Sequence, residues 1–453
     1  MKIIDTLKNV WKITELKDRI ILTLGLLLVY RFGAQVVLPG INIDSLGALQ
    51  AGTSEGLLGL LNAFTGGAFA NASVFALGIM PYISASIVVQ LMGIAIPYLQ
   101  KLQKEGASGQ KKITQITRWL TIGICLVQAP GYLASIPALS GASSMGAMLL
   151  PGFSVNIFYF SSIVILVTGC VFAMWLGEKI TDKGIGNGIS LLIMVGIIAN
   201  LPLSFSQNLT SRLSGNGGFM MILIELVIWF LIILASVFLV MAVRKIAVQY
   251  ARRTASGGYE KNVFGSRQFL PLKLNASGVM PIIFAQAIMF VPALIGGSSL
   301  MKESAAGQWM QTNFSDIFGF WYNFVFALLI IIFTYFYTAI TVPTNKMADD
   351  LKRSGGFIPG IRPGSETSEY LDKIMSQITL PGSIFLALIA IFPAFIVKLM
   401  GVQQGWALFF GGTSLLIMVG VAIDTIQQIN SYLLNKHYDG LMKTGKNRKA
   451  VSQ

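Results

Sequence analysis

The chain has 453 residues, of which 54% are hydrophobic and 11% charged, and its mean hydropathy is +0.70. This is more apolar surface than the core of a water-soluble domain can bury, so the composition excludes a soluble globular protein and favours a protein that lies in lipid. A formal net charge of +14 would also suit a nucleic-acid-binding protein, which predicts basic side chains on one face.

The residues before the first apolar segment predict an amphipathic helix over 1–19 on the cytoplasmic membrane surface, with a frayed basic arm as the alternative. The first apolar segment begins at Ile20. It is too long for the hydrophobic region of a signal peptide and no small-residue cleavage site follows, so we expect it to stay in the mature protein. Apolar residues of the predicted amphipathic helix recur between lysines at Ile3, Ile4, Leu7, Val10 and Trp11.

Ten apolar segments are each long enough for a helix to cross about 30 Å of hydrocarbon. Of the 33 Lys and Arg residues, 29 lie before the first segment, in the loops after segments two, four, six and eight, or in the tail. This alternation argues against one basic face, and the positive-inside rule places both termini in the cytoplasm. The segments are 20–38, 74–96, 119–138, 153–176, 185–206, 219–243, 274–295, 317–342, 379–397 and 405–426.

The stretch between the first two segments, EGLLGLLNAFTGG at 55–67, is apolar but too short to cross a membrane. It predicts a re-entrant half-helix that ends at its glycines and plugs a cavity. A loop helix at the membrane interface is the alternative.

Two motifs occur twice. GIMPYISA at 78–85 matches GVMPIIFA at 278–285, and GISLLIMVG at 188–196 matches GTSLLIMVG at 412–420. Both pairs are five segments apart. The chain therefore predicts two five-helix halves, and because five is odd the second half inserts upside down, which makes an inverted repeat.

Inverted repeats place a functional path between the halves, lined by helices that Gly and Pro make irregular. Pro81 and Pro281 occupy equivalent positions in the first motif, so we expect a kink in each of these two segments. A tolerated packing kink is the alternative reading of an isolated proline.

The side chains on this path distinguish a pore from a coupled transporter. A transporter needs ionisable groups near the midplane, whereas the repeated motifs supply isoleucines. Arg31, Glu225 and Asp424 lie within or at the edge of segments, and we expect each to be a satisfied charge at a helix end. An apolar constriction without ion ligands gates by dewetting and can deform around a passing chain.

Enzymatic and metal chemistry have no candidate residues. The only histidine is His437 in the tail, Asp349 and Asp350 lie in a loop, and Cys125 and Cys170 fall inside apolar segments without metal-site spacing. We therefore expect no catalytic residue, no metal and no cofactor.

Five motifs make the chain resemble the SecY/SEC61-alpha family, in that family's order and spacing and over essentially the whole length. One stretch departs from the pattern: VRKIAVQY at 243–250 lacks the Gln-Arg-Arg opening and the Pro before Val-Gln-Tyr. This weakens inference for that loop only. The motifs are ALGIMPYISASI at 76–87, GIGNGIS at 184–190, LPLKLNASG at 270–278, GIRPG at 360–364 and FGGTSLLI at 410–417.

The resemblance implies an all-α polytopic membrane protein with ten transmembrane helices in two inverted five-helix halves, arranged as a clamshell around an hourglass pore, with a re-entrant plug half-helix. The first half would be 20–206 with its plug at 55–70, and the second half 207–430. Cytoplasmic loops would lie at 244–273 and 343–378, and a cytoplasmic tail at 431–453.

The resemblance also implies site residues, carried over motif by motif. The pore ring would be Ile79, Ile83, Ile193, Ile283 and Ile417. The plug would include Leu57, Leu58, Leu60, Leu61, Asn62, Phe64, Thr65, Gly66 and Gly67. A lateral gate toward lipid would involve Ser84, Ile87, Phe290 and Val291, and contacts with a motor or ribosome would involve Arg252, Arg253 and Arg362.

Members of this family conduct unfolded secretory polypeptides and release signal sequences and transmembrane segments into lipid. The resemblance implies the membrane subunits SecE and SecG, the ATPase SecA and the ribosome as partners. Contact with ribosomal RNA would not be sequence-specific. The resemblance also implies a multi-pass protein of the bacterial inner membrane. The alternative is an inverted-repeat secondary transporter of a small solute.

Overall fold

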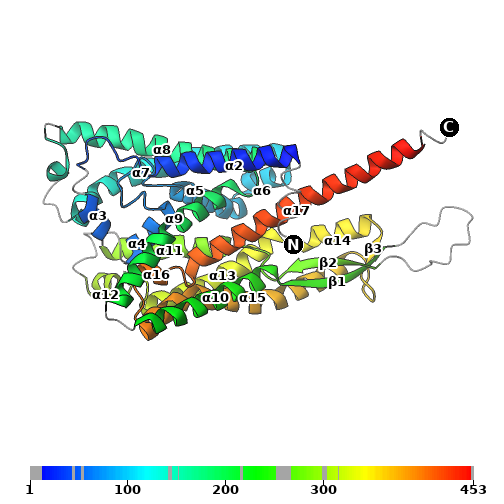
Figure 1. Ribbon diagram of the computed structural model, residues 1–453. Helices are drawn as coiled ribbons and strands as arrows, with labels where there is room; N and C mark the ends of the chain where they lie inside the picture. The colour runs from blue at the N-terminus through cyan, green and yellow to red at the C-terminus, as the bar shows by residue number, and fades with distance from the viewer. Residues whose placement is uncertain are drawn as a thin grey trace, which may run out of the picture. The chain divides into compact units, whose positions relative to one another are not determined.

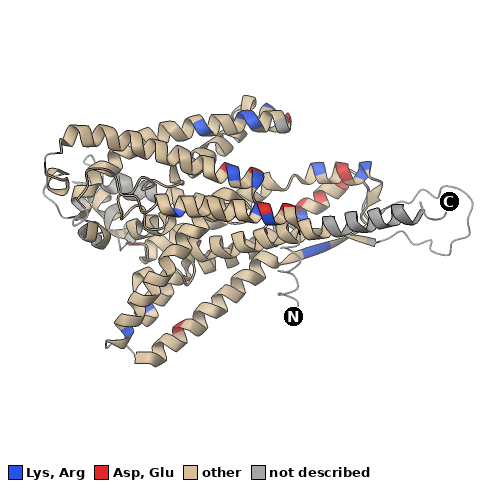
Figure 2. Ribbon diagram, turned by 45° about the horizontal axis from the view of Figure 1, so that its top comes forward, with Lys and Arg blue, Asp and Glu red and all other residues tan. Residues whose placement is uncertain are grey.

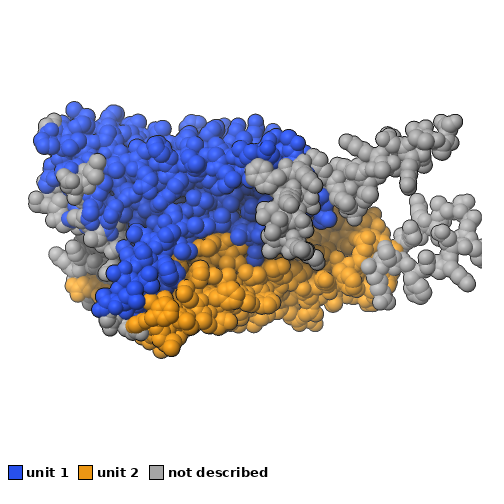
Figure 3. Space-filling view, in the orientation of Figure 1, with its two compact units in different colours: residues 1–216, 403–408, 421–453 blue, residues 217–402, 409–420 orange. Residues whose placement is uncertain are grey.

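A computed structural model describes residues 13–42, 46–52, 56–140, 145–151, 153–214, 218–250, 267–297, 304–314 and 316–449 (Figure 1). The chain divides into two compact units, coloured separately in Figure 3. Unit 1 comprises Met1–Asn216, Gln403–Leu408 and Val421–Gln453, and unit 2 comprises Gly217–Val402 and Phe409–Gly420.

Unit 1 is helical wherever regular secondary structure is described. Its helices are α2 (Thr14–Gly33), α3 (Leu46–Gly52), α4 (Gly56–Thr65), α5 (Met80–Ala95), α6 (Pro97–Lys104), α7 (Ala107–Ser140), the 3-10 helix Met145–Met148, α8 (Val155–Lys183), α9 (Gly188–Leu213) and α16 (Gln404–Ala407). Helix α17 (Gly412–Lys449) begins in unit 2 and continues in unit 1 from Val421.

Unit 2 combines helices with a small sheet. Its helices are α10 (Gly218–Met241), α11 (Met280–Gly297), α12 (Ala305–Phe314), α13 (Phe320–Thr341), α14 (Thr344–Arg353) and α15 (Ser365–Met400). Its strands are β1 (Val243–Tyr250), β2 (Arg267–Lys273) and β3 (Gly356–Phe357), in the antiparallel order β2-β1-β3.

The class of a helical multi-pass membrane protein is confirmed, and each of the ten predicted segments overlaps a helix. Seven described helices are long and apolar enough to cross a membrane, and the bent pair Met80–Gly93 and Pro97–Gln103, which meets at 101°, would make an eighth. Helix α2 carries four charges in its first two turns, and the described apolar part of α11 is short. Ten spans therefore remain a prediction. Figure 2 shows the charged residues mostly near helix ends, separated by long uncharged stretches.

The repeated prolines do not kink a helix, so that expectation was wrong. Helix α5 begins at Met80 and α11 at Met280, which makes Pro81 and Pro281 the second residue of each helix. At this position the missing N–H loses no helical hydrogen bond and the ring meets no preceding turn. The expectation assumed that the helices continue upstream, whereas irregular turns precede both.

The two copies of the first motif have the same backbone. The motif's glycine is left-handed in both, with φ +54° at Gly78 and +65° at Gly278. Its N–H donates to the carbonyl three residues earlier, at 2.8 Å and 3.4 Å respectively. The N–H of the isoleucine five residues later donates to the carbonyl four residues earlier, at 3.1 Å for Ile83 and 3.3 Å for Ile283. The two copies of the motif therefore share backbone conformation as well as sequence.

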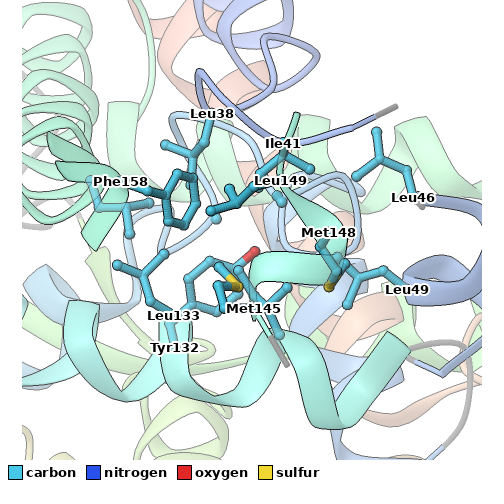
Figure 4. Close-up of a cluster of buried hydrophobic side chains, with 14 of the residues drawn as sticks. Leu38, Ile41, Leu46, Leu49, Tyr132, Leu133, Met145, Met148, Leu149 and Phe158 are labelled. Carbon is cyan, nitrogen blue, oxygen red and sulfur yellow. The ribbon is translucent and has the colours of Figure 1, made fainter. Parts of the chain in front are cut away.

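A hydrophobic cluster of unit 1 supports the chain on both sides of α4 (Figure 4). It joins side chains of α3, α7 and α8 to the turns that follow α4, and Leu58 of α4 packs against it. Its labelled members in Figure 4 are Leu38, Ile41, Leu46, Leu49, Tyr132, Leu133, Met145, Met148, Leu149 and Phe158.

The sheet of unit 2 lies in segments that were predicted to be loops: β1 and β2 fall in loop 244–273 and β3 in loop 343–378. Ile246 and Val248 alternate with less buried residues of β1 and are buried in a cluster with side chains of α15. Pro271 lies in β2, which is an edge strand. Proline is tolerated in edge strands because one side of such a strand forms no hydrogen bonds with another strand.

Candidate functional site

A short apolar helix occupies the position where the sequence predicts a re-entrant half-helix. Helix α4 spans ten residues, Gly56–Thr65, which is about half of the length that a membrane crossing needs. Leu60, Phe64 and Thr65 are buried in it. The predicted plug residues Leu61 and Asn62 are partly buried, and the side chain of Leu57 lies outside the described residues.

Polar groups from α2 and α9 meet the carboxyl end of α4. Gly66 and Gly67 end the helix with left-handed φ of +67° and +89°. The Arg31 guanidinium, in the last turn of α2, donates from Nη1 to the Gly66 carbonyl. The Asn200 amide, in α9, donates from Nδ2 to the Asn62 carbonyl at 3.3 Å. The Asn62 carbonyl also accepts from the Gly67 N–H at 2.9 Å, so side chains of two other helices supplement the local hydrogen bonds at this helix end.

The backbones of α4 and α9 approach each other at two glycines. A Cβ built on Gly196 would lie 2.6 Å from the Phe64 carbonyl oxygen and 3.2 Å from the Gly66 nitrogen. A Cβ on Gly66 would lie 2.8 Å from the Gly196 Cα. Any side chain at Gly196 therefore requires α4 and α9 to move apart.

The irregular turns after α4 are also held within unit 1. The Tyr132 hydroxyl of α7 donates to the Phe69 carbonyl at 2.8 Å, and the Leu38 N–H donates to the Ala72 carbonyl at 2.9 Å. The Phe75 ring stacks on the Tyr30 ring with centroids 5.4 Å apart. These contacts connect α4 to the start of α5, where two of the predicted ring residues lie.

The predicted ring residues of unit 1 lie near α4. Ile79 immediately precedes α5 and is buried, and Ile83 follows one helical turn later and is partly buried. Ile193 is buried in α9, three residues before the glycine that contacts α4.

Unit 2 places its two predicted ring residues near one helix contact. A Cβ on Gly420 in α17 would meet Val279 Cγ1 at 3.1 Å, so the start of α17 packs beside the start of α11. Ile283 lies one turn after Val279 and is partly buried, and Ile417 lies one turn before Gly420 and is buried.

The predicted gate is described only in part. The Ser84 hydroxyl donates to the Met80 carbonyl at 3.1 Å within α5, and Ile87 of the same helix is buried. The side chains of Phe290 and Val291 lie outside the described residues, as do Arg252 and Arg253 entirely.

Arg362 lies in a compact turn before α15. Gly360 and Gly364 flank it with φ of +84° and +117°. The Thr367 hydroxyl donates to the Arg362 carbonyl at 2.8 Å. The Arg362 side chain is 88% exposed, and its ion pair with Glu366 is long at 3.8 Å. The turn thus fixes the backbone and leaves the guanidinium accessible to a partner.

Metal and redox chemistry have no visible centre in the described ranges, which contain no group of three or more His, Cys, Asp or Glu placed to hold a metal ion. Cys125 and Cys170 are buried without a disulfide bond.

Arg31 and Asn200 are site residues that the sequence analysis missed. Arg31 was predicted only as a charge at a helix end, although a basic residue inside an apolar segment indicates that another group stabilises it there. Asn200 carried no comparable signal, because its partner is a backbone carbonyl that depends on the path of α4.

The sequence matches the model of the SecY family over residues 73–426. The protein translocase subunit SecY of Mycobacterium bovis is 40% identical over 439 residues, which cover 95% of this chain and 97% of that protein.

Solved structures show the same fold at lower identity. A SecY structure, described as one whose plug domain stabilises the closed state of the translocation channel and maintains a membrane seal, superposes with a TM-score of 0.60 at 18% identity over 91% of each chain. Sec61 in a canine ribosome–channel complex from the endoplasmic reticulum superposes with a TM-score of 0.55 at 16% identity, again over 91% of each chain.

Proposed function

Because the chain belongs to the SecY family, we propose that it is the pore-forming subunit of a Sec translocase, through which unfolded secretory polypeptides cross the membrane. The observation that carries the mechanism is the seat of α4, a helix too short to span a membrane that lies backbone to backbone against α9 at Gly196. A translocase of this family is a channel and not an enzyme, so energy for directional transport comes from a partner.

The resting protein excludes ions with two apolar barriers. The first is a ring of Ile79, Ile83, Ile193, Ile283 and Ile417, which dewets when its side chains meet and spreads around a passing chain. The second is α4 together with the residues up to Ala70, which fills the pore until it is displaced. The burial of Ile79, Ile193 and Ile417 in their own units supports a tight resting state.

Hydrophobic segments leave the pore sideways. Each Leu, Ile, Phe or Val favours lipid by roughly 0.3 to 0.6 kcal/mol at the membrane centre, so a signal sequence or a transmembrane segment gains several kcal/mol by leaving the pore. The exit would lie between Ser84 and Ile87 of α5 and Phe290 and Val291 of α11. Polar segments lack this gain and continue across.

Cytoplasmic partners supply the force. We propose that SecA or a translating ribosome docks on the loops of unit 2, where Arg362 is presented, with Arg252 and Arg253 as further contacts. The ribosome-bound canine Sec61 complex, which has the same fold, supports the ribosome as a partner. SecE and SecG would accompany the chain in the membrane. The basic loops support a topology with both termini in the cytoplasm, and the bacterial relatives support the inner membrane as the location.

Ion conductance tests the proposed barriers. The full chain, purified with its co-purifying membrane subunits and reconstituted in liposomes, is compared with a variant lacking 57–70 and with the same deletion combined with Ile83→Gly and Ile283→Gly. We expect the intact protein to be ion-tight, the deletion to leak and the combination to leak more, because each change removes one apolar barrier.

The same measurement separates a channel from a carrier. A carrier binds its solute at a site that is never open to both sides, so neither change would make it conduct ions. If none of the three proteins conducts, the assigned plug and ring are wrong.

A further inference from the structure

Arg31 is a cation in an apolar helix whose described polar partner is a backbone carbonyl. It lies in the last turn of α2, which is apolar from Ile20 to Tyr30 apart from Thr23. Its Nη1 donates to the Gly66 carbonyl, and among the described residues no carboxylate forms an ion pair with it. The Arg31 side chain is partly buried, and taking an unpaired ion partly out of water costs free energy, so we expect another group to stabilise it there.

The carboxyl end of α4 provides that stabilisation. The last carbonyls of a helix lack partners within the helix and carry the negative end of its dipole, so a guanidinium is attracted to them. A hydrogen bond from a charged donor is roughly twice as strong as one between neutral groups, and low surrounding polarity strengthens it further. The Arg31 contact is therefore a charge-assisted hydrogen bond between the last turn of α2 and the residue that follows α4.

The position of Arg31 is itself fixed. Tyr30, its neighbour in sequence, is buried and stacks on Phe75, whose ring stacks in turn on Phe172 of α8 at 6.1 Å. A Cβ on Gly33 would fall within 2.2 Å of the Phe75 ring, so the end of α2 packs directly on this residue. Arg31 therefore extends from a packed helix end, and little additional conformational entropy is lost when its guanidinium binds the end of α4.

We propose that Arg31 is a latch that holds α4 in its closed seat and sets how often the resting channel opens. Moving α4 away breaks the bond to Gly66 and leaves the partly buried guanidinium without its described carbonyl partner, so opening is disfavoured. The proposal rests on the proposed function of α4 as the plug. Arg31 acts on the pore only through α4, which makes it a positioning residue.

The test compares Arg31→Met and Arg31→Lys in the full chain with its co-purifying subunits, in liposomes. Met keeps the apolar length of the side chain without the charge, whereas Lys keeps the charge but not the planar fork. Arg19→Met is the matched control, because it removes a charge from the other end of α2, where the guanidinium lies over the Tyr432 ring. Each substitution is also made in the variant lacking 57–70.

We expect Arg31→Met to raise the resting ion conductance roughly tenfold or more, because a hydrogen bond to a charged group is lost. Arg31→Lys should restore part of the closure, and Arg19→Met should stay tight. In the variant lacking 57–70, Arg31→Met should add nothing, because its target is gone. An additional leak in that background would show that Arg31 acts on the pore wall and would overturn the latch.

The two proposals fail differently. If deletion of 57–70 produces no leak, the proposed function of α4 is wrong. If the deletion leaks while Arg31→Met stays as tight as the unaltered protein, the plug stands and the latch is wrong. A thermal unfolding midpoint for every variant identifies a leak that comes from general unfolding, which would count against the latch.

Discussion

Gly196→Ala is expected to make the resting protein leak ions. The added Cβ would lie 2.6 Å from the Phe64 carbonyl oxygen, which belongs to the backbone and cannot rotate away. The contact between α4 and α9 at Gly196 must therefore open, which we expect to displace α4. Overpacking of this kind costs ~1–3 kcal/mol, which corresponds to a rise of roughly 5- to 150-fold in the unseated population. Single-channel recording in lipid bilayers measures it directly as more frequent openings.

Gly123→Ala is the matched control for this substitution. Gly123 also lies within a membrane helix, α7, but a Cβ on it would meet nothing within 4 Å. It should leave the resting conductance unchanged. Equal conductance of the two variants, whether both leak or both stay tight, would contradict the seat of α4 on α9.

Arg362→Glu is expected to abolish most transport that depends on a cytoplasmic partner while leaving the resting seal intact. The Arg362 side chain is exposed at a rigid turn, so its loss removes a contact without disturbing a core. Reversing its charge replaces attraction with repulsion at a docking surface, which costs several kcal/mol if the partner is acidic there. Transport of a secretory polypeptide into vesicles should fall by at least about tenfold.

Lys352→Glu controls for net charge at the same end of unit 2. Lys352 is exposed in the last turn of α14 and belongs to no predicted contact. Its reversal should reduce transport far less than that of Arg362. Normal transport by Arg362→Glu, or equal loss in both variants, would contradict a specific contact at this turn.

The helices were predictable because apolar length in lipid allows few other structures. Backbone groups without water must bond within the segment, so an apolar stretch of about 20 residues is a helix almost by necessity. The same argument predicts α4 as a short helix, since its apolar run ends at Gly66 and Gly67.

The errors came from contacts that a single segment does not contain. Pro81 was predicted to kink a helix because the residues before it are also apolar. The helix instead begins at Met80, after a turn in which Gly78 is left-handed. Strand β1 lies in a segment that was predicted to be a basic loop, yet the alternation of buried Ile246 and Val248 with less buried neighbours is a period-two signal that could have identified the strand. The partner of Arg31 depends on how α4 folds back, which no local pattern encodes.

Photo-crosslinking of an arrested polypeptide tests the central claim, a protein-conducting pore lined by the isoleucine ring, most directly. A photoreactive amino acid replaces Ile83, Ile193, Ile283 or Ile417 in turn, and a secretory polypeptide is stopped partway by a folded domain at its end. Phe230 in α10, which is exposed on an apolar helix, is the control position. We predict crosslinks from positions in both units to the same stretch of the polypeptide, and none from Phe230. Crosslinks from one unit alone, or from Phe230 as strongly as from the ring, would contradict this account.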